Sequence, residues 1–230
     1  MRPNWPCLKG SLFKCLVENV ESTAVNKTDP DIMAYLRPEI LVSAYADGLF
    51  PMVQDGELMW FRPQHRGLMP LDDRFHVSRS LARTIGRERF ICTIDRCFDS
   101  VMRLCANRPD GGETWISPEI LTAYAKLHEL GFAHSFEAWP ADHVGVGEPV
   151  GGLYGVALGG AFFGESMFHT ATDAGKVALA SCVEHLRRRG FTVFDLQWTT
   201  PNLERFGAYE TPNRRYMTIL REAVNARVRF

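Results

Sequence analysis

The sequence predicts an α/β (α+β) fold in which a mixed sheet covered by helices follows a small N-terminal domain. Helix and strand signals alternate along the main part of the chain, in the order helix, strand, helix, hairpin, helix, strand, which is typical of such a sheet. A compact aromatic region stands before them, and Pro63 and Pro70 end it. The chain has 230 residues, enough for one large domain or for one domain plus a small one.

The N-terminal part begins with a segment that has no clear hydrophobic period. We expect residues 1–30 to be a loosely ordered extension. The first clear helix runs from about Pro38 to Asp47, because proline occupies its first position and Gly48 follows its end. Short strands and turns follow over residues 50–61. The expected units are the extension over 1–30, a small domain over 31–72 and the main domain over 73–230.

The main domain opens with alternating elements. Its expected helices cover 78–85, 98–106 and a segment that opens at Ser117-Pro118-Glu119 and stops at Gly131, and its expected strands cover 90–95 and 132–139. The third helix is marked most clearly, because serine caps it, proline occupies its first position and glycine ends it. Residues 140–149 are rich in Pro, Asp, Gly and Glu, so we expect an exposed loop.

The centre of the chain predicts a hairpin. Strands over 150–158 and 161–168 flank Gly159-Gly160, a pair typical of a tight turn. A helix over 174–189 with a basic last turn follows, then an apolar strand over 191–198 that we expect to be buried. A short helix and a final helix from about Pro212 complete the predicted order.

Composition limits the class of protein. With 46% hydrophobic and 23% charged residues and a net charge of −1, the chain is ordinary for a soluble globular protein. A polyanionic partner would therefore have to bind a local basic patch. The six cysteines form no C-x-x-C pair, so we expect free thiols in a reducing, cytoplasmic compartment. No stretch resembles a membrane span or a signal peptide.

Two expected strands carry polar groups where apolar side chains predominate. Asp195 and Gln197 lie two residues apart on one face of the strand 191–198. Glu165 lies among large apolar neighbours in the strand 161–168. Since a carboxylate in a central strand is costly unless it is hydrogen-bonded or faces a cleft, the two strands indicate a shared polar site with an apolar wall. The alternative is structural, with Asp195 capping a helix or pairing with an arginine and Glu165 facing solvent.

Several catalytic motifs are incomplete. The segment Gly164-Glu165-Ser166-Met167-Phe168 lacks the last glycine of a nucleophile elbow and lies in a hairpin, which argues against a serine hydrolase. The glycines of 151–155 precede a strand, so they cannot hold a phosphate at a helix N-terminus. His134 and His169 have no partner at metal-ligand spacing, so we expect structural or hydrogen-bonding roles for them and no metal site.

Nine blocks in order along residues 31–222 carry a resemblance to a known family. The blocks are 46–52 (Ala-Asp-Gly-Leu-Phe-Pro-Met), 79–81 (Arg-Ser-Leu), 114–116 (Thr-Trp-Ile), 123–128 (Ala-Tyr and Leu-His), 134–139 (His-Ser, Glu and Trp), 151–158 (Gly-Gly-Leu-Tyr-Gly-Val-Ala-Leu), 162–168 (Phe-Phe-Gly-Glu-Ser-Met-Phe), 176–179 (Lys-Val-Ala-Leu) and 194–197 (Phe-Asp-Leu-Gln). Together they are highly specific, and the chain resembles the bacterial leucyl/phenylalanyl-tRNA–protein transferases.

This resemblance implies a GNAT-like catalytic domain after a small N-terminal domain. It implies transfer of Leu, Phe or sometimes Met from aminoacyl-tRNA to proteins or peptides that begin with Arg or Lys, which marks them for N-degron degradation. No metal, acyl-CoA or other cofactor is expected, and no membrane partner.

The chain also departs from the family pattern. It has Met59-Trp60-Phe61-Arg62-Pro63 where Trp-Trp-Ser-Pro is expected, Gly175 where serine precedes the lysine, and Asn202 where histidine is common. The first 30 residues have no counterpart, and the loop 140–149 looks extended. These differences concern contacts to tRNA or substrate more than the chemistry.

The resemblance gives roles to the polar pair. We expect Asp195 and Gln197 to be the catalytic residues that orient and deprotonate the incoming amine, with the charge on Asp195 and the alignment from Gln197. The alternative is that the leaving ribose hydroxyl carries the proton. Glu165 would bind the cationic protein N-terminus or shape the pocket.

The remaining expected site residues bind the donor. By resemblance the aminoacyl pocket is formed by Leu153, Phe162, Met167, Leu179 and Phe194. Trp115 is expected to stack on the terminal adenine, or alternatively to pack at a helix start. The basic run Arg79, Arg83, Arg87 and Arg89 would contact acceptor-stem phosphates, or alternatively form a solvated helix face.

Two other functions remain open at this point. One is an N-acyltransferase that uses acyl-CoA, although the 169–175 segment has only one glycine for a pyrophosphate loop. The other is a tRNA-binding protein without catalysis, against which Asp195 and Gln197 argue. The sequence does not indicate the oligomeric state, and a monomer is the simplest expectation.

Overall fold

The computed structural model describes residues 25–26, 29–107 and 114–230. The expected extension over 1–30 lies outside the described residues except for 25–26 and 29–30. Cys7 and Cys15 also lie outside them. The four cysteines inside are free thiols, namely Cys92, Cys97, Cys105 and Cys182.

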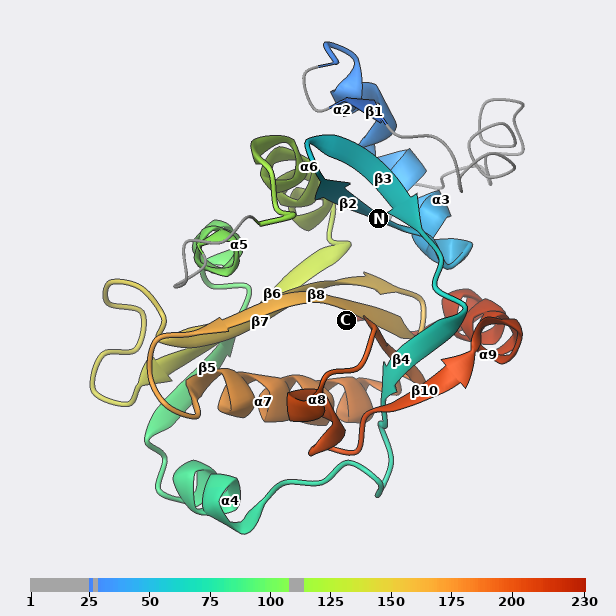
Figure 1. Cartoon of the computed structure of the whole chain (residues 1–230). Coiled ribbons are helices and arrows are strands. Elements are labelled where there is room, and N and C mark those ends of the chain that lie inside the picture. Colours follow the sequence, from blue (N-terminus) through green and yellow to red (C-terminus); the bar gives the residue numbers. More distant parts are fainter. Residues whose placement is uncertain (1–24, 27–28, 108–113) are drawn as a thin grey trace.

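The described strands form a small sheet and a large mixed sheet (Figure 1). The small one has the order β1-β3-β2, with β1 (Val25–Asn26), β2 (Phe50–Gln54) and β3 (Glu57–Phe61). The large one has the order β10-β4-β9-β8-β7-β6-β5, with β4 (His65–Met69), β5 (Phe90–Ile94), β6 (Ala133–Pro140), β7 (Gly151–Leu158), β8 (Ala161–His169), β9 (Val193–Gln197) and β10 (Tyr209–Pro212). Its neighbours are antiparallel except for β8 and β9, which are parallel and joined by a helix.

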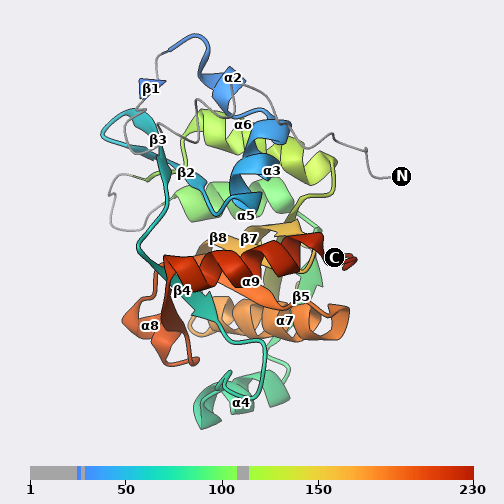
Figure 2. The ribbon, with the colours of Figure 1, turned by 90° about the vertical axis from the view of Figure 1, so that its right-hand side faces the viewer.

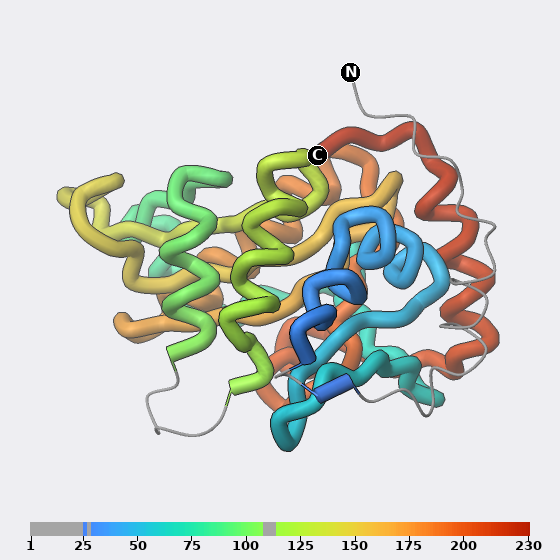
Figure 3. Tube along the Cα trace, turned by 90° about the horizontal axis from the view of Figure 1, so that it is seen from above, coloured from blue at the N-terminus to red at the C-terminus, as the bar shows by residue number. Residues whose placement is uncertain are grey.

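Helices cover both faces of the large sheet. One face packs against α7 (Ala174–Arg189), with α4 (Arg79–Gly86) below it (Figure 1). The other face packs against α3 (Pro38–Ala46), α5 (Phe98–Ala106) and α6 (Pro118–Glu129), which lie side by side when seen from above (Figure 3). The helix α9 (Asn213–Asn225) crosses one end of the sheet (Figure 2), and α2 (Ile32–Tyr35) and α8 (Pro201–Glu204) are single turns.

Each face of the sheet has its own apolar core. Alternation along β8 sends Phe162 to the core beside α7 and Phe163 to the core beside α3, α5 and α6. Tyr154 joins the second core, whereas its neighbour Leu153 joins the first. We call the face that carries Phe163 and Tyr154 the α5/α6 face.

The α/β class with a mixed sheet is confirmed. The helices α5 and α7 begin and end where the sequence predicts, and Ser117 caps α6 by accepting from the Ile120 N–H. The strand β4 lies between β9 and β10 in the large sheet, although it precedes the domain boundary expected near residue 72. That boundary stays a prediction. None of the described helices is both long and apolar enough to span a membrane.

Candidate functional site

A β-bulge places Glu165 on the α5/α6 face. Ser166 pairs with Tyr154 of β7 and Gly164 pairs with Gly155, so Glu165 is an extra residue in its strand without a partner opposite. Such a bulge changes the direction of the side chains that follow it. Glu165 and Ser166 therefore both point to this face, where Glu165 contacts Tyr45 and Tyr124.

A second bulge lies in the neighbouring strand. Gly67 of β4 pairs with Gln197 and Leu68 pairs with Asp195, which leaves Leu196 as the extra residue. Gln197 has a positive φ of 60°, which is uncommon for a residue with a side chain. The Gln197 N–H donates to Oδ1 of Asp195 at 2.8 Å and so fixes this conformation.

Asp195 is a buried anchor. Arg66 donates to it from Nε at 2.8 Å and from Nη2 at 2.7 Å, and neither side chain is exposed to solvent. The Tyr216 hydroxyl from α9 donates to the same carboxylate. With the Gln197 N–H, four donors occupy the Asp195 oxygens, so few lone pairs of this carboxylate are left for a further donor.

Arg66 itself is held on all sides. It donates from Nη1 to the Gly48 carbonyl at 3.0 Å. Its guanidinium lies 4.8 Å from the ring centres of both Phe50 and Tyr216. Cation–π contacts of this kind stabilise a desolvated arginine. Arg66 thereby connects the N-terminal segment to the last helix through the site.

Glu165 has a different environment. Tyr45 donates to its Oε1 at 2.7 Å, and Nε2 of Gln197 lies 3.4 Å from the same oxygen. No ion pair involves Glu165 among the described residues. Burial raises its pKa from 4.5 to about 8, with Asp195 adding to the rise and the Tyr45 hydrogen bond and Arg66 opposing it. This carboxyl group can therefore gain or lose a proton near neutral pH.

Glu165 and Gln197 lie where the strands β8 and β9 separate. The parallel pairing of β8 and β9 ends at Phe163 and Asp195, two residues before Glu165 and Gln197. Beyond this point the strands make no further ladder bonds with each other, so the polar groups of both strands lie at the opening. The expected shared site of these residues agrees with this arrangement.

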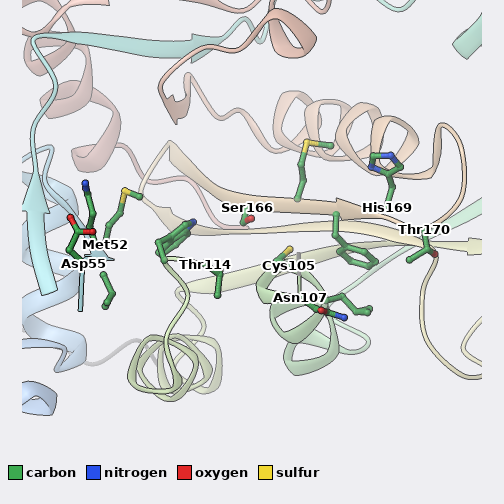
Figure 4. Close-up of a pocket in the computed structure, with 14 residues that line it drawn as sticks. Met52, Asp55, Cys105, Asn107, Thr114, Ser166, His169 and Thr170 are labelled. Atoms are coloured by element: carbon green, nitrogen blue, oxygen red, sulfur yellow. The ribbon is translucent and has the colours of Figure 1, made fainter. Parts of the chain in front are cut away.

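A cavity of about 720 Å³ adjoins the opening. It begins at Ser166, one residue beyond Glu165, and follows β8 to Thr170 between the β2–β3 hairpin and the end of α5 (Figure 4). Its other lining residues are Met52, Val53, Gln54, Asp55, Leu104, Cys105, Asn107, Thr114, Trp115, Met167, Phe168 and His169. The size is that of sites for small molecules, and the lining combines apolar and polar groups.

The structure places some of the residues expected to bind the donor at the cavity and others in the core beside α7. Trp115 and Met167 line the cavity. Trp115 also precedes α6 and packs against the core, so both roles considered for it agree with its position. Four other residues expected in the pocket, Leu153, Phe162, Leu179 and Phe194, are buried in the core beside α7 and do not line this cavity.

None of the expected phosphate-binding arginines lines the cavity. Arg79 and Arg83 lie in α4, and Arg87 and Arg89 follow it. All four are exposed, and the sheet and α7 lie between α4 and the α5/α6 face (Figure 1). The structure does not bring them together with Trp115.

His134 has structural surroundings, whereas His169 does not pack in the core. Nδ1 of His134 lies 2.7 Å from Asp95, and the His134 ring stacks on Phe230 at 3.7 Å between centres. His169 lines the cavity. Within the described part of the chain no group of acidic residues, His and Cys has metal-ligand geometry.

Four residues of the site had no predicted role, namely Tyr45, Arg66, Tyr124 and Tyr216. Tyr45 falls on the apolar stripe of its helix and Tyr124 in a block shared with the family, but a tyrosine in a core looks the same from sequence whether its hydroxyl is used or not. A buried arginine such as Arg66 leaves no local signal. Only the partner, a misplaced carboxylate in β9, indicated that a cation was needed.

Comparisons with known proteins agree on one family. The model of the "Leucyl/phenylalanyl-tRNA protein transferase" family matches residues 68–221, and the model of its N-terminal domain matches residues 35–64. A leucyl/phenylalanyl-tRNA–protein transferase of Akkermansia muciniphila is 48% identical over 191 residues, covering 82% of this chain and 96% of the relative. One of Herpetosiphon aurantiacus is 48% identical over 195 residues, covering 85% and 98%. The solved structure of FemX shares 12% identity with a TM-score of 0.48, covering 80% of this chain and 71% of that one.

Proposed function

The chain belongs to the leucyl/phenylalanyl-tRNA protein transferase family, and from this premise we propose that it transfers Leu or Phe from aminoacyl-tRNA to the N-terminal amine of proteins that begin with Arg or Lys. The observation that carries the proposal is the extent of the match, since two family models together cover most of residues 35–221. The polar opening beside a cavity also supports it.

The reaction needs alignment more than energy. An aminoacyl ester is already activated, so the enzyme must bring the amine to the ester carbonyl, and proximity of this kind is worth about 7–11 kcal/mol in good geometry. We assign this alignment to Gln197. Its side chain lies at the opening between β8 and β9, beside Glu165.

Asp195 then acts through Gln197. Its four hydrogen bonds leave few lone pairs for a further donor, whereas its bond to the Gln197 N–H holds that residue at positive φ. We therefore propose that Asp195 is a positioning residue. The ribose hydroxyl of the leaving tRNA remains the acceptor for the proton that nitrogen loses during the attack.

The donor's 3′ end occupies the cavity in this proposal. Trp115 stacks on the terminal base, since aromatic side chains bind unpaired bases in this way. The apolar side chains of Met52, Met167 and Phe168 give the aminoacyl group an apolar wall. Methionine adapts its shape, which suits Leu, Phe and Met alike. Branched Ile and Val are expected to be poorer donors by a modest factor.

The same proposal extends to the fate of the labelled acceptor, the compartment, the oligomeric state and the exposed arginines. Acceptors labelled in this way enter the N-degron pathway, and the reaction takes place in the cytoplasm, where charged tRNA is found. The enzyme works as a monomer. Arg79, Arg83, Arg87 and Arg89 form a solvated face, because all four are exposed and none lines the cavity.

The test is the transfer of radiolabelled Leu from its tRNA to a peptide that begins with Arg. Matched peptides that begin with Met or Glu, and an arm with acyl-CoA in place of charged tRNA, are the controls. We expect label only on the Arg peptide and only with charged tRNA. Label from acyl-CoA, or binding of tRNA without any transfer, would contradict the proposal.

A further inference from the structure

Two buried tyrosines that have no role in the proposed function form a chain of hydrogen bonds with Glu165. Tyr45 from α3 and Tyr124 from α6 are fully buried, and their hydroxyl groups bond to each other. The Tyr45 hydroxyl donates to Oε1 of Glu165 at 2.7 Å, and the Tyr124 hydroxyl lies 3.5 Å from Oε2. Because each phenol has one hydrogen, Tyr45 donates to Glu165 and Tyr124 donates mainly to the Tyr45 oxygen.

The phenols are reliable donors. Burial and the neighbouring Glu165 raise the pKa of Tyr45 and of Tyr124 above the usual value for tyrosine. Both hydroxyls therefore keep their hydrogens at any pH at which the protein works. A third phenol, that of Tyr154, is equally buried but makes no hydrogen bond within the described residues.

The ionisation of Glu165 depends on these neighbours. The titratable and charged side chains that shift its pKa come from four elements and are Tyr45, Tyr124, Arg66 and Asp195. Tyr154 also faces Glu165, but there the carboxyl group raises the pKa of the phenol. Burial is the largest effect and raises the pKa of Glu165, whereas the hydrogen bonds from Tyr45 and Tyr124 lower it. Loss of either phenol hydroxyl therefore raises the pKa of Glu165 further.

The amine and the carboxyl group are matched. A free α-ammonium has a pKa of about 7.7–8.0, and Glu165 has a pKa of about 8. Proton transfer between groups of similar pKa has little thermodynamic cost, which is the condition for effective acid–base catalysis. The oxygens of the Asp195 carboxylate, in contrast, are occupied by four donors.

We propose that Glu165 takes the proton from the acceptor's α-ammonium and that Tyr45 and Tyr124 are positioning residues that hold this carboxylate toward the opening between β8 and β9. The proposal rests on the transfer function above. One ammonium proton moves to Glu165, and the neutral nitrogen attacks the ester carbonyl. A C–N bond forms, the bond to the ribose oxygen breaks, and that oxygen takes the second proton from nitrogen. Glu165 then releases its proton to water.

The experiment measures single-turnover transfer from Leu-tRNA to the Arg peptide between roughly pH 6 and pH 9, at saturating enzyme. The proteins are the wild type, Glu165→Gln, Tyr45→Phe, Tyr124→Phe and, as the matched control, Tyr154→Phe. Circular dichroism and thermal unfolding show which variants fold. A wild type without transfer would contradict the proposed function and not this inference.

The variants are expected to differ in the shape of the pH–rate profile as well as in the size of the rate. Glu165→Gln is slower than wild type by about 10²–10⁴-fold at low pH, and the difference narrows at high pH, where the amine is already neutral. Tyr45→Phe moves the rising limb of the profile to higher pH but reaches a similar plateau. Tyr124→Phe moves it less, because its bond to Glu165 is longer. Tyr154→Phe follows the wild type.

A merely structural role gives another pattern. Glu165→Gln would then be slower than wild type by the same factor at every pH, and the tyrosine variants would lose rate without any displacement of the profile. Either result overturns the proposal. If Tyr45→Phe does not fold, the pH dependence of the Glu165→Gln ratio decides alone.

Discussion

At the scale of single residues, the two carboxyl groups of the site are separated by their hydrogen-bond partners. Asp195 has Arg66 as a bidentate partner, whereas Glu165 has phenols and an amide. An ion pair holds a charge in place, and neutral donors leave a proton free to move. One site thus contains a carboxylate that is fixed by an ion pair and a carboxyl group that has neutral partners. Gln197 connects them, because its N–H bonds to Asp195 and its side-chain amide to Glu165.

We predict that Arg66→Met lowers the free energy of unfolding by about 3–5 kcal/mol, because it leaves the Asp195 carboxylate buried without its cation. Urea unfolding measures the change. Arg74→Met is the matched control, since Arg74 and Asp72 are also bidentate but are 63% and 57% exposed, and this variant should unfold like the wild type. Equal midpoints for both variants would show that the buried pair contributes no more than the exposed one.

The raised pKa of Glu165 predicts a pH dependence of stability. Between its unfolded value of 4.5 and its folded value of about 8, the folded protein binds more protons at this group than the unfolded chain. Stability due to Glu165 is therefore present at low pH and is lost as the pH rises through about 8. Glu165→Gln, which does not titrate, should gain stability relative to wild type as the pH rises.

This prediction is checked by urea unfolding of both proteins at about pH 5 and about pH 9. Each pKa unit between the folded and unfolded states corresponds to about 1.4 kcal/mol. Glu222→Gln, on an exposed part of α9, is the control and should differ from wild type by the same amount at both pH values. A Glu165→Gln difference that does not change with pH would show that the carboxyl group is not perturbed.

At the scale of elements, the site depends on two bulges in adjacent strands. Glycines let the strands approach closely at the first one. A Cβ on Gly155 would lie 2.3 Å from the Phe163 carbonyl oxygen, and one on Gly164 would lie 2.8 Å from the Phe194 ring. The backbone at Gly155 cannot move away without moving the strand that carries Glu165.

We therefore predict that Gly155→Ala destabilises the protein by about 1–3 kcal/mol and slows transfer, because the bulge must shift. Gly86→Ala is the matched control. Gly86 ends α4, and a Cβ there would meet nothing within 4 Å, so alanine should be neutral or slightly stabilising. Thermal unfolding compares the two. Gly155→Ala as stable as Gly86→Ala would contradict the close packing of β7 and β8.

The elements themselves were predictable to a large extent. Caps such as Ser117-Pro118 and stops such as Gly190 act within a few residues, so α6 and α7 could be read from local signals. The pairing of β4 with β9 joins residues more than a hundred positions apart and leaves no such signal. The two β-bulges could not be predicted from the sequence either, because the pairing register of a strand depends on its partner strand.

The site likewise has parts that local sequence signals indicated and parts that depend on long-range packing. Asp195, Gln197 and Glu165 attracted attention because polar groups stood among apolar ones. The pocket wall was placed by resemblance, and strand alternation places Phe162 and Phe194 in the core beside α7, away from the cavity. A cavity formed by a hairpin, a helix end and a strand end could not be read from any one segment.

At the scale of the whole molecule, the exposed arginines of 79–89 and the cavity are separate features of the surface. We predict that replacing Arg79, Arg83, Arg87 and Arg89 together with Gln leaves the Kd for charged tRNA and its salt dependence unchanged, because none of these exposed side chains lines the cavity. Filter binding at several salt concentrations measures both. Trp115→Ala is the positive control and should weaken binding without a change in the salt slope.

Phosphate contacts by these arginines would give a different salt dependence. If these arginines contact phosphates, each lost contact reduces the slope of log K against log salt by about 0.7–0.9. A fall of this size in the quadruple variant would place the tRNA over the edge of the sheet and around to α4. It would restore the phosphate-binding role that the sequence allowed.

The insertion of β4 between β9 and β10 has a consequence for how the enzyme is made. A ribosome adds roughly 5–20 residues per second, so β4 waits on the order of ten seconds for both of its neighbours to be synthesised. During that interval Arg66 has neither Asp195 nor Tyr216. The contacts that hold Arg66 in the site are therefore complete only after α9 has been synthesised.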